Sequence, residues 1–123
     1  MKQLNLANMC IDELLTRFVE IGLAQDAALE DDDLAKYNRL YNGMDAIRLE
    51  LKARGKDARL TLTRLYSHPN AQVRFKAAVC SYVVAPEAAR ACLQAIRDSK
   101  MPPQYLDAGM TLRAIDNGTS MLD

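Results

Sequence analysis

The chain has 123 residues, which is close to the usual size of one domain and excludes a second large hydrophobic core. Half of the residues are hydrophobic and 26% are charged, which excludes the polar composition of disorder, and the net charge of +0 is unlike the strong positive charge of most nucleic-acid binders. Because the N-terminus lacks the apolar run of a signal peptide and no apolar run reaches about 18 residues, we expect a cytoplasmic protein without a membrane span.

The first expected element is a pair of helices over residues 11–53. Apolar residues from Ile11 to Leu29 follow helical spacing, and a second apolar face ends before Gly55, a residue favoured just past a helix. That second face, in which we expect both tyrosines to lie in the core, consists of Leu34, Tyr37, Tyr41, Met44, Ile47 and Leu51. The acidic run 30–33 suits the start of a helix, so we place the break there, with one long bent helix over 11–53 as the alternative.

From Lys56 onward the pattern predicts shorter helices that form two hairpins, 56–84 and 86–116. The first hairpin is expected to contain one helix from Lys56 to about Ser67 and another that ends at about Val84. His68-Pro69-Asn70 marks the turn of the first hairpin, and Pro86 suits the first turn of a helix. No stretch alternates as a strand does, so the predicted fold is all-α with about six helices. A weak repeat of 31 residues predicts stacked hairpins whose shared core contains Leu62, Leu65, Val73, Ala77, Cys80, Leu93, Ile96 and Leu112.

Two resemblances follow from these residues. The run Leu62-x-x-Leu65-x-x-His68-Pro69-x-x-x-Val73-Arg74-x-x-Ala77-Ala78 resembles one HEAT-type repeat. Most of the chain resembles a bacterial family of domains of unknown function, numbered two-oh-one-nine, through Ile11-Asp12-Glu13-Leu14, Leu40-Tyr41, His68-Pro69-Asn70, Ala85-Pro86-Glu87-Ala88-Ala89-Arg90 and Asp107-Ala108-Gly109-Met110. The resemblances imply a bacterial source and one HEAT-like domain over 1–123, a short right-handed stack of antiparallel helical hairpins, and they imply no activity.

Residues with catalytic potential are few and scattered. His68 is the only histidine, and its place beside Pro69 indicates hydrogen bonding to the backbone. Cys10 has no base near it in sequence, and Cys80 and Cys92 lie among apolar residues, as core cysteines do. The acidic run 30–33 lacks the glycine and the spaced oxygen ligands of a calcium loop. We therefore expect no enzyme activity, no metal and no cofactor.

Charge is distributed unevenly along the chain. Residues 1–33 carry eight acidic side chains and two basic ones, a net charge of −6, so the remainder carries +6. The predicted partner-binding residues are Asp26, Glu30, Asp31, Asp32 and Asp33. The predicted alternative is a basic face that contains Arg48, Lys52 and Arg59. The structural interpretation of the acidic run, a solvated helix turn, stands beside the functional one.

The size, the missing chemistry and the segregated charge together favour a non-catalytic protein-binding domain. Small helical proteins of this kind resemble immunity partners of secreted toxins, so the leading hypothesis is an immunity protein that occludes the active cleft of a cationic toxin, a nuclease in the simplest case. The alternatives are nucleic-acid binding through basic helices in 48–76 and a homo-oligomeric scaffold. We expect Arg74 to have a structural role, tying one hairpin to its neighbour.

Overall fold

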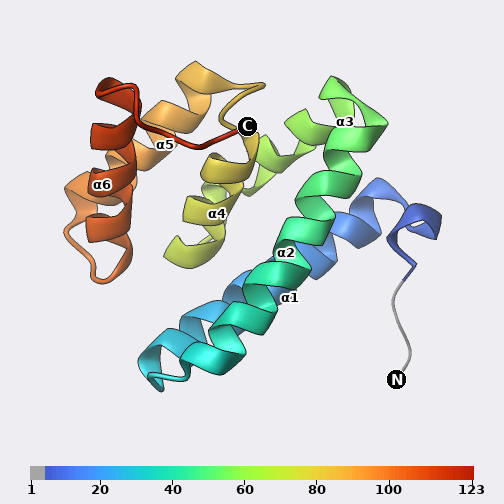
Figure 1. The fold of residues 1–123 in the computed structure, drawn as a ribbon, viewed down its shortest axis with the longest axis horizontal. Coiled ribbons are helices and arrows are strands. Elements are labelled where there is room, and N and C mark those ends of the chain that lie inside the picture. Colours follow the sequence, from blue (N-terminus) through green and yellow to red (C-terminus); the bar gives the residue numbers. More distant parts are fainter. Residues whose placement is uncertain (1–4) are drawn as a thin grey trace. The chain divides into compact units, whose positions relative to one another are not determined.

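The structure, a computed structural model, describes residues 5–123, and all regular structure within that range is helical (Figure 1). The six α-helices and two 3-10 helices, in chain order, are η1 (Leu6–Asn8), α1 (Ile11–Glu30), α2 (Leu34–Arg54), α3 (Lys56–Leu60), η2 (Thr61–Ser67), α4 (Ala71–Ser81), α5 (Pro86–Ser99) and α6 (Gln104–Asp116). The all-α prediction with about six helices is therefore confirmed. No helix in the described range is both long enough and apolar enough to cross a membrane.

The chain divides into two compact units, Met1–Thr61 and Leu62–Asp123. The first contains η1, α1, α2 and α3, and the second contains α4, α5 and α6, while η2 begins at the boundary. This boundary falls inside the predicted first hairpin, 56–84. The single-domain organisation and the HEAT-like stacking stay predictions.

The first unit is built on an antiparallel hairpin of α1 and α2 (Figure 1). The two predicted helices are confirmed, and the alternative of one bent helix is wrong because α1 ends at Glu30. The buried residues of the pair follow helical spacing and include Leu14, Phe18, Ile21 and Ala28 in α1 and Met44, Ile47 and Leu51 in α2. The prediction that Tyr41 lies in the core was wrong, because it is 50% exposed, and Tyr37 is only half-buried; Leu34, on the same predicted face, is 69% exposed. At 100° per residue Leu34 and Tyr41 lie about a quarter of a turn away from the buried face of α2.

A single arginine connects the end of this hairpin to the N-terminal segment. Arg54, in the last turn of α2, pairs with Glu50 at 2.8 Å. Its guanidinium also donates hydrogen bonds to the carbonyl oxygens of Leu6, at 2.9 Å, and Met9, at 2.7 Å. The charge of Arg54 therefore stabilises the fold and is not free to bind a partner.

The predicted helix from Lys56 to Ser67 is divided in two, because α3 ends at Leu60 and a 3-10 helix follows. Thr61 and Thr63 open that segment, and β-branched residues have a low helix propensity. The Thr61 hydroxyl donates to the Ala58 carbonyl, which provides a local alternative to the helical ladder. The helix predicted to reach Val84 ends three residues earlier, at Ser81, and Pro86 takes the first position of α5 as predicted.

The second unit has its own apolar core. The predicted second hairpin, 86–116, is present as α5 and α6, and α4 packs against α5. The core cluster consists of Phe75, Ala78, Ala89, Cys92, Leu93, Ile96, Ala108 and Leu112. Three of these residues are alanines that are fully buried, so the helices approach each other closely. Of the eight predicted core residues, seven are buried, whereas Leu65, in η2, is only half-buried.

A polar contact fixes α6 on α4. The Gln104 Nε2 amide donates to the side-chain Oε1 of Gln72 at 2.9 Å, and both residues are almost fully buried. One turn further along, burial raises the pKa of Asp107, while the charge of Lys76 on α4 lowers it. Because buried polar groups need partners, these contacts specify one register of α6 on α4.

Truncating a core leucine tests this packing. Leu93→Ala should lower the free energy of unfolding by about 2 to 5 kcal/mol, because Leu93 is fully buried and its truncation leaves a cavity. The control, Val83→Ala, removes atoms from a side chain that is 49% exposed and should change stability by only about 0.5 kcal/mol. Both are measured by urea titration, and equal losses for the two variants would contradict the assigned core.

Candidate partner-binding site

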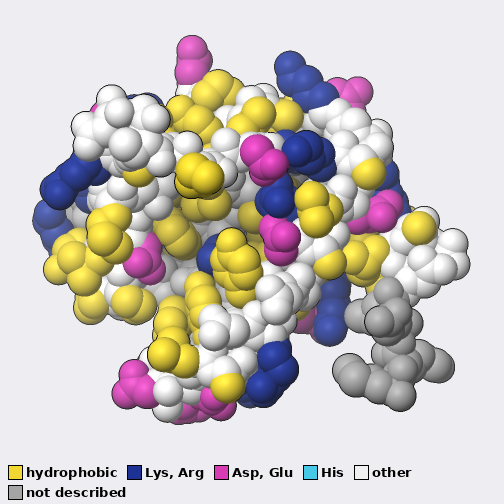
Figure 2. All heavy atoms as spheres, in the orientation of Figure 1, with side chains coloured by type: hydrophobic (Ala, Val, Ile, Leu, Met, Phe, Trp, Pro, Cys, Tyr) yellow, Lys and Arg dark blue, Asp and Glu magenta, His cyan; other side chains and the backbone are white. Residues whose placement is uncertain are grey.

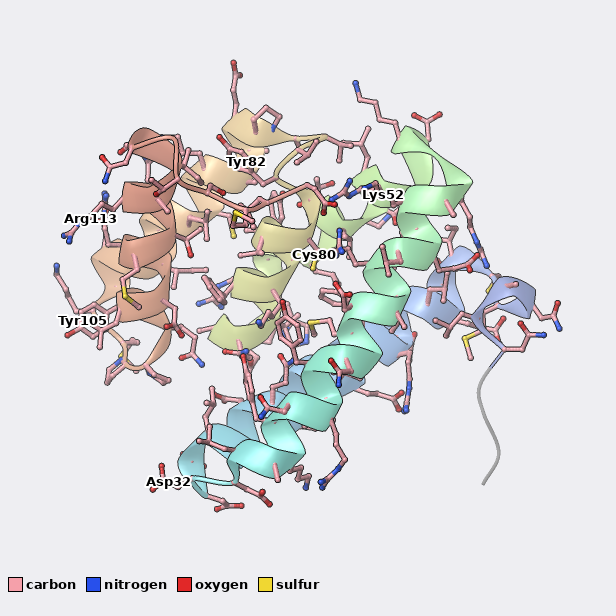
Figure 3. The ribbon with its side chains drawn as sticks, viewed as in Figure 1. Asp32, Lys52, Cys80, Tyr82, Tyr105 and Arg113 are labelled. Atoms are coloured by element: carbon pink, nitrogen blue, oxygen red, sulfur yellow. The ribbon has the colours of Figure 1, made fainter. Side chains whose placement is uncertain are left out.

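The turn between α1 and α2 contains three of the predicted carboxylates, and Figure 3 shows Asp32 at this end of the hairpin. Asp31 caps α1, and Asp32 has φ 54, in the left-handed region. The Asp33 amide donates to the carbonyl of Ala28 at 2.9 Å and the Asp32 amide to that of Leu29 at 3.3 Å. These two bonds form a Schellman motif, which satisfies the last carbonyls of α1.

Asp33 also begins the next helix. Its Oδ1 accepts a hydrogen bond from the Lys36 amide at 3.1 Å, which makes Asp33 the N-cap of α2. Asp32 and Asp33 are therefore explained by the turn itself, since aspartate tolerates left-handed backbone and caps helices well. An arrangement of Asp26, Glu30 and Asp33 on one helical face is excluded, because Asp33 belongs to α2.

The geometry of the turn does not account for the other predicted carboxylates, which are Asp26, Glu30 and Asp31. Glu30 and Asp31 are exposed at the C-terminal end of α1, and the last turn of α1 contains no basic residue. Carboxylates at this negative end of the helix dipole each destabilise a helix by about 0.3 to 1 kcal/mol. Asp26, one turn earlier, is half-buried. Helix stability therefore does not account for the acidic residues at the end of α1.

The acidic surface extends along α1 beyond the predicted residues. The solvent-facing side of α1 carries Asp12, Glu13, Glu20, Asp26 and Glu30, and Arg17 is the sole cation of the helix. Arg17 pairs with Glu20 at 3.8 Å beside a shallow hollow that Asp12 and Glu13 also line. We call these five carboxylates, together with Asp31, Asp32 and Asp33, the acidic surface. Asp12, Glu13 and Glu20 were not among the predicted partner-binding residues, although helical spacing places them opposite the apolar face.

The predicted alternative, a basic face, is not assembled as expected. Arg59 is only 4% exposed, so its guanidinium does not lie on a surface. Arg48 pairs with Asp45 at 2.8 Å, and Lys52 is exposed. Two further cations of the segment 48–76 also make contacts within the fold or are buried. Arg54 donates to carbonyls of the N-terminal segment, and Lys76 is buried. Counting basic residues along the sequence therefore overestimated the positive charge that is free to bind.

His68 and Arg74 stabilise the turn before α4. His68 Nδ1 accepts a hydrogen bond from the Asn70 amide at 3.0 Å, which confirms the predicted backbone contact. Arg74 donates from Nη1 to the carbonyls of His68 and Pro69, at 2.7 and 2.9 Å. The predicted structural role of Arg74 is confirmed, but the arginine ties down the turn of its own hairpin instead of a neighbouring one.

The cysteines lie in different environments. Cys10 is exposed at the start of α1, and its amide donates to Glu13 at 3.0 Å, which lowers the pKa of that carboxyl group. Cys80 and Cys92 are buried, as predicted, and burial raises the pKa of the Cys92 thiol. Within residues 5–123, no three histidine, cysteine, aspartate or glutamate residues are grouped so as to hold a metal ion.

Comparison with known proteins identifies the family of this chain. The family described as "Domain of unknown function (DUF2019)" matches residues 12–116. The crystal structure of the protein RPA1889 from Rhodopseudomonas palustris CGA009 is similar over 98% of this chain and 100% of that chain, with 41% sequence identity and a TM-score of 0.93. A search of curated proteins found no match to the chain. The family resemblance seen in the sequence is thus confirmed.

The turn between α1 and α2 yields a stability prediction. Asp33→Ala should lower the free energy of unfolding by about 1 kcal/mol, because the Lys36 amide loses its capping acceptor. Asp33→Ser retains an acceptor and should restore most of the loss. Urea titration of both variants checks this prediction, and equal stability of the alanine and serine variants would contradict the N-cap.

The cysteine environments predict a difference in reactivity. In the native protein Cys10 should react quickly with a thiol reagent such as Ellman's reagent, whereas Cys80 and Cys92 should react slowly, because reagents reach buried thiols only after local opening. Cys10→Ser identifies the fast phase by removing it. Reaction of all three thiols at the rate seen in denaturant would contradict the burial of Cys80 and Cys92.

Proposed function

Since the chain belongs to the DUF2019 family, whose description assigns no activity, we propose a function from its surface. The chain is a non-catalytic protein-binding domain, and its acidic surface binds a basic region of a partner protein. This assignment rests on chemistry that the chain itself presents on α1 and the turn that follows.

One observation carries the proposal: the exposed side of α1 bears five carboxylates and one cation, and its C-terminal end adds Asp31 where no helix requirement calls for it. Figure 2 shows acidic side chains gathered at the end of the hairpin. Like charges so close together repel each other and lower the stability of the free protein. A cationic partner removes that repulsion on binding, so the crowded charge favours the complex.

The geometry of α1 suits an elongated basic cleft. Asp12 and Glu30 are 18 residues apart, which corresponds to about 27 Å along a helix at 1.5 Å per residue. A row of carboxylates over this length is complementary to a groove built to hold a phosphate backbone. This supports the finer proposal that the partner is a cationic nuclease toxin and that the chain is its immunity protein, occluding the active cleft.

The other two hypotheses have less support. Nucleic-acid binding depended on cations in 48–76, and Arg48, Arg54 and Arg74 are engaged in ion pairs or carbonyl contacts, while Arg59 and Lys76 are buried. A homo-oligomeric scaffold requires a self-complementary face, and the acidic surface repels its own copy.

Neutralising three carboxylates near the C-terminal end of α1 tests the proposal. The partner is recovered from the source cell by affinity capture on the full chain, and its association is measured by surface plasmon resonance at low and high salt. The triple variant Asp26→Asn, Glu30→Gln, Asp31→Asn leaves the structural residues Asp32 and Asp33 intact. It should lower the association rate by about tenfold at low salt and weaken its salt dependence, because electrostatic steering acts mainly on encounter.

A matched variant controls for net charge. Asp57→Asn, Glu87→Gln, Asp123→Asn removes the same charge from exposed positions outside the acidic surface. It should leave the association rate within about twofold of the natural chain, since steering depends on local potential. Equal rates for the two triple variants would remove the acidic surface from the binding site.

A further inference from the structure

Helix α6 is apolar on two opposite sides. Its buried side carries Ala108 and Leu112, which belong to the core of the second unit. Leu106 and Met110, at i and i+4, share the opposite side and are 54% and 61% exposed, and Met101 just before the helix is 63% exposed. Figure 2 shows hydrophobic side chains gathered over this region, at the left of the view. We call the surface formed by Met101, Leu106 and Met110 the α6 surface.

The fold of the second unit does not need these side chains. Ala108 and Leu112 lie within about 40° of each other around the helix, whereas Leu106 is more than 100° from both. A large side chain there contributes no core packing and leaves apolar area in water. Exposed apolar side chains at helical spacing, two of them flexible methionines, are typical of surfaces that receive another helix.

Two cations border the α6 surface. Lys100 ends α5 in left-handed backbone, with φ 59, immediately before Met101. Arg113 follows Met110 by one turn on the same side of α6, and Figure 3 shows its side chain directed away from the helices. Within residues 5–123, the side chains of Lys100 and Arg113 form no ion pair or hydrogen bond. Two cations that are not paired within the described residues therefore lie beside the α6 surface.

The positive charge of Lys100 and Arg113 distinguishes between two candidate occupants of the α6 surface, a second copy of this chain and a different partner. In an antiparallel pairing of α6 with the α6 of a second copy, centred between Leu106 and Met110, residue 113 of one chain faces residue 103 of the other. Arg113 would then lie beside the Lys100 of the other copy, and the two-fold axis would repeat this like-charge contact. A second copy is thus disfavoured, whereas carboxylates on a different partner would neutralise both cations.

We propose that the α6 surface docks an amphipathic helix of a partner protein, whose apolar stripe is flanked at both ends by acidic side chains. The stripe covers Met101, Leu106 and Met110, and the acidic ends pair with Lys100 and Arg113. Because this surface lies on the second unit and is basic at its rim, it is separate from the acidic surface on α1. The inference therefore holds or fails independently of the proposed function.

A pair of designed peptides tests the inference on the full chain. Both peptides are helical and carry the same two-turn leucine stripe, one with glutamates at both ends of the stripe and the other with lysines. Binding is measured by fluorescence anisotropy of the labelled peptide. The glutamate peptide should bind at least tenfold more tightly than the lysine peptide, and this preference should shrink with added salt. Backbone amide shifts caused by the glutamate peptide should be centred on residues 100–113.

Variants assign the contact to named side chains. Leu106→Gln, Met110→Gln should weaken binding of the glutamate peptide at least tenfold without changing the melting temperature, because both side chains are exposed. Val83→Gln, which replaces another exposed apolar residue of the second unit, should leave binding unchanged. Lys100→Gln, Arg113→Gln should abolish the preference for the glutamate peptide.

Three results would overturn the inference. The first is failure of the glutamate peptide to bind at any concentration that keeps it soluble. The second is equal affinity for the two peptides, which would remove the charged rim from recognition. The third is concentration-dependent dimerisation of the natural chain, seen by sedimentation and lost in Leu106→Gln, Met110→Gln, which would identify the α6 surface as a contact between copies.

Discussion

At Asp31, Asp32 and Asp33 the chain must end one long helix and begin another within three residues, and the acidic surface depends on how it does so. The last carbonyls of α1 are satisfied by the amides of Asp32 and Asp33, which requires left-handed backbone at Asp32. The first amides of α2 need an acceptor, which the Asp33 carboxylate supplies. Aspartate meets both demands, and the sharp turn leaves its neighbours Glu30 and Asp31 crowded and exposed at the end of the hairpin.

Several cations of the chain make structural contacts within the fold. Arg54 and Arg74 donate to backbone carbonyls, and Arg59 and Lys76 are buried. A guanidinium presents several donors in a fixed plane, so it satisfies carbonyls that lie outside regular helices. On the exposed side of α1, by contrast, the printed contacts of the carboxylates are local, since Glu13 accepts from the Cys10 amide and Glu20 pairs with Arg17 one turn away. Several cations of residues 48–76 are therefore used within the fold, whereas most acidic side chains of α1 are exposed.

The two units differ in how each helix divides its apolar residues. In α1 they lie mainly on one face, which packs within the hairpin, although Leu23, 44% exposed, lies on the charged side. In α6 they occupy opposite sides, because Ala108 and Leu112 supply the core while Leu106 and Met110 are exposed. A helix with one apolar face is complete within its own unit, whereas a helix with two has one face left for another molecule. This difference separates an electrostatic surface on α1 from an apolar one on α6.

The sequence by itself determined the all-helical fold, most helix ends and most of the core, because helical periodicity, prolines and caps act over a few neighbouring residues. It also located the acidic run and the structural turn at His68. Only the tertiary structure decided that Arg59 is buried and that Leu65, Leu34 and Tyr41 are not core. Those outcomes depend on which face of a helix meets another element and on which carbonyls lie within reach of a cation. Both are contacts between residues far apart in the chain, and periodicity carries no information about them.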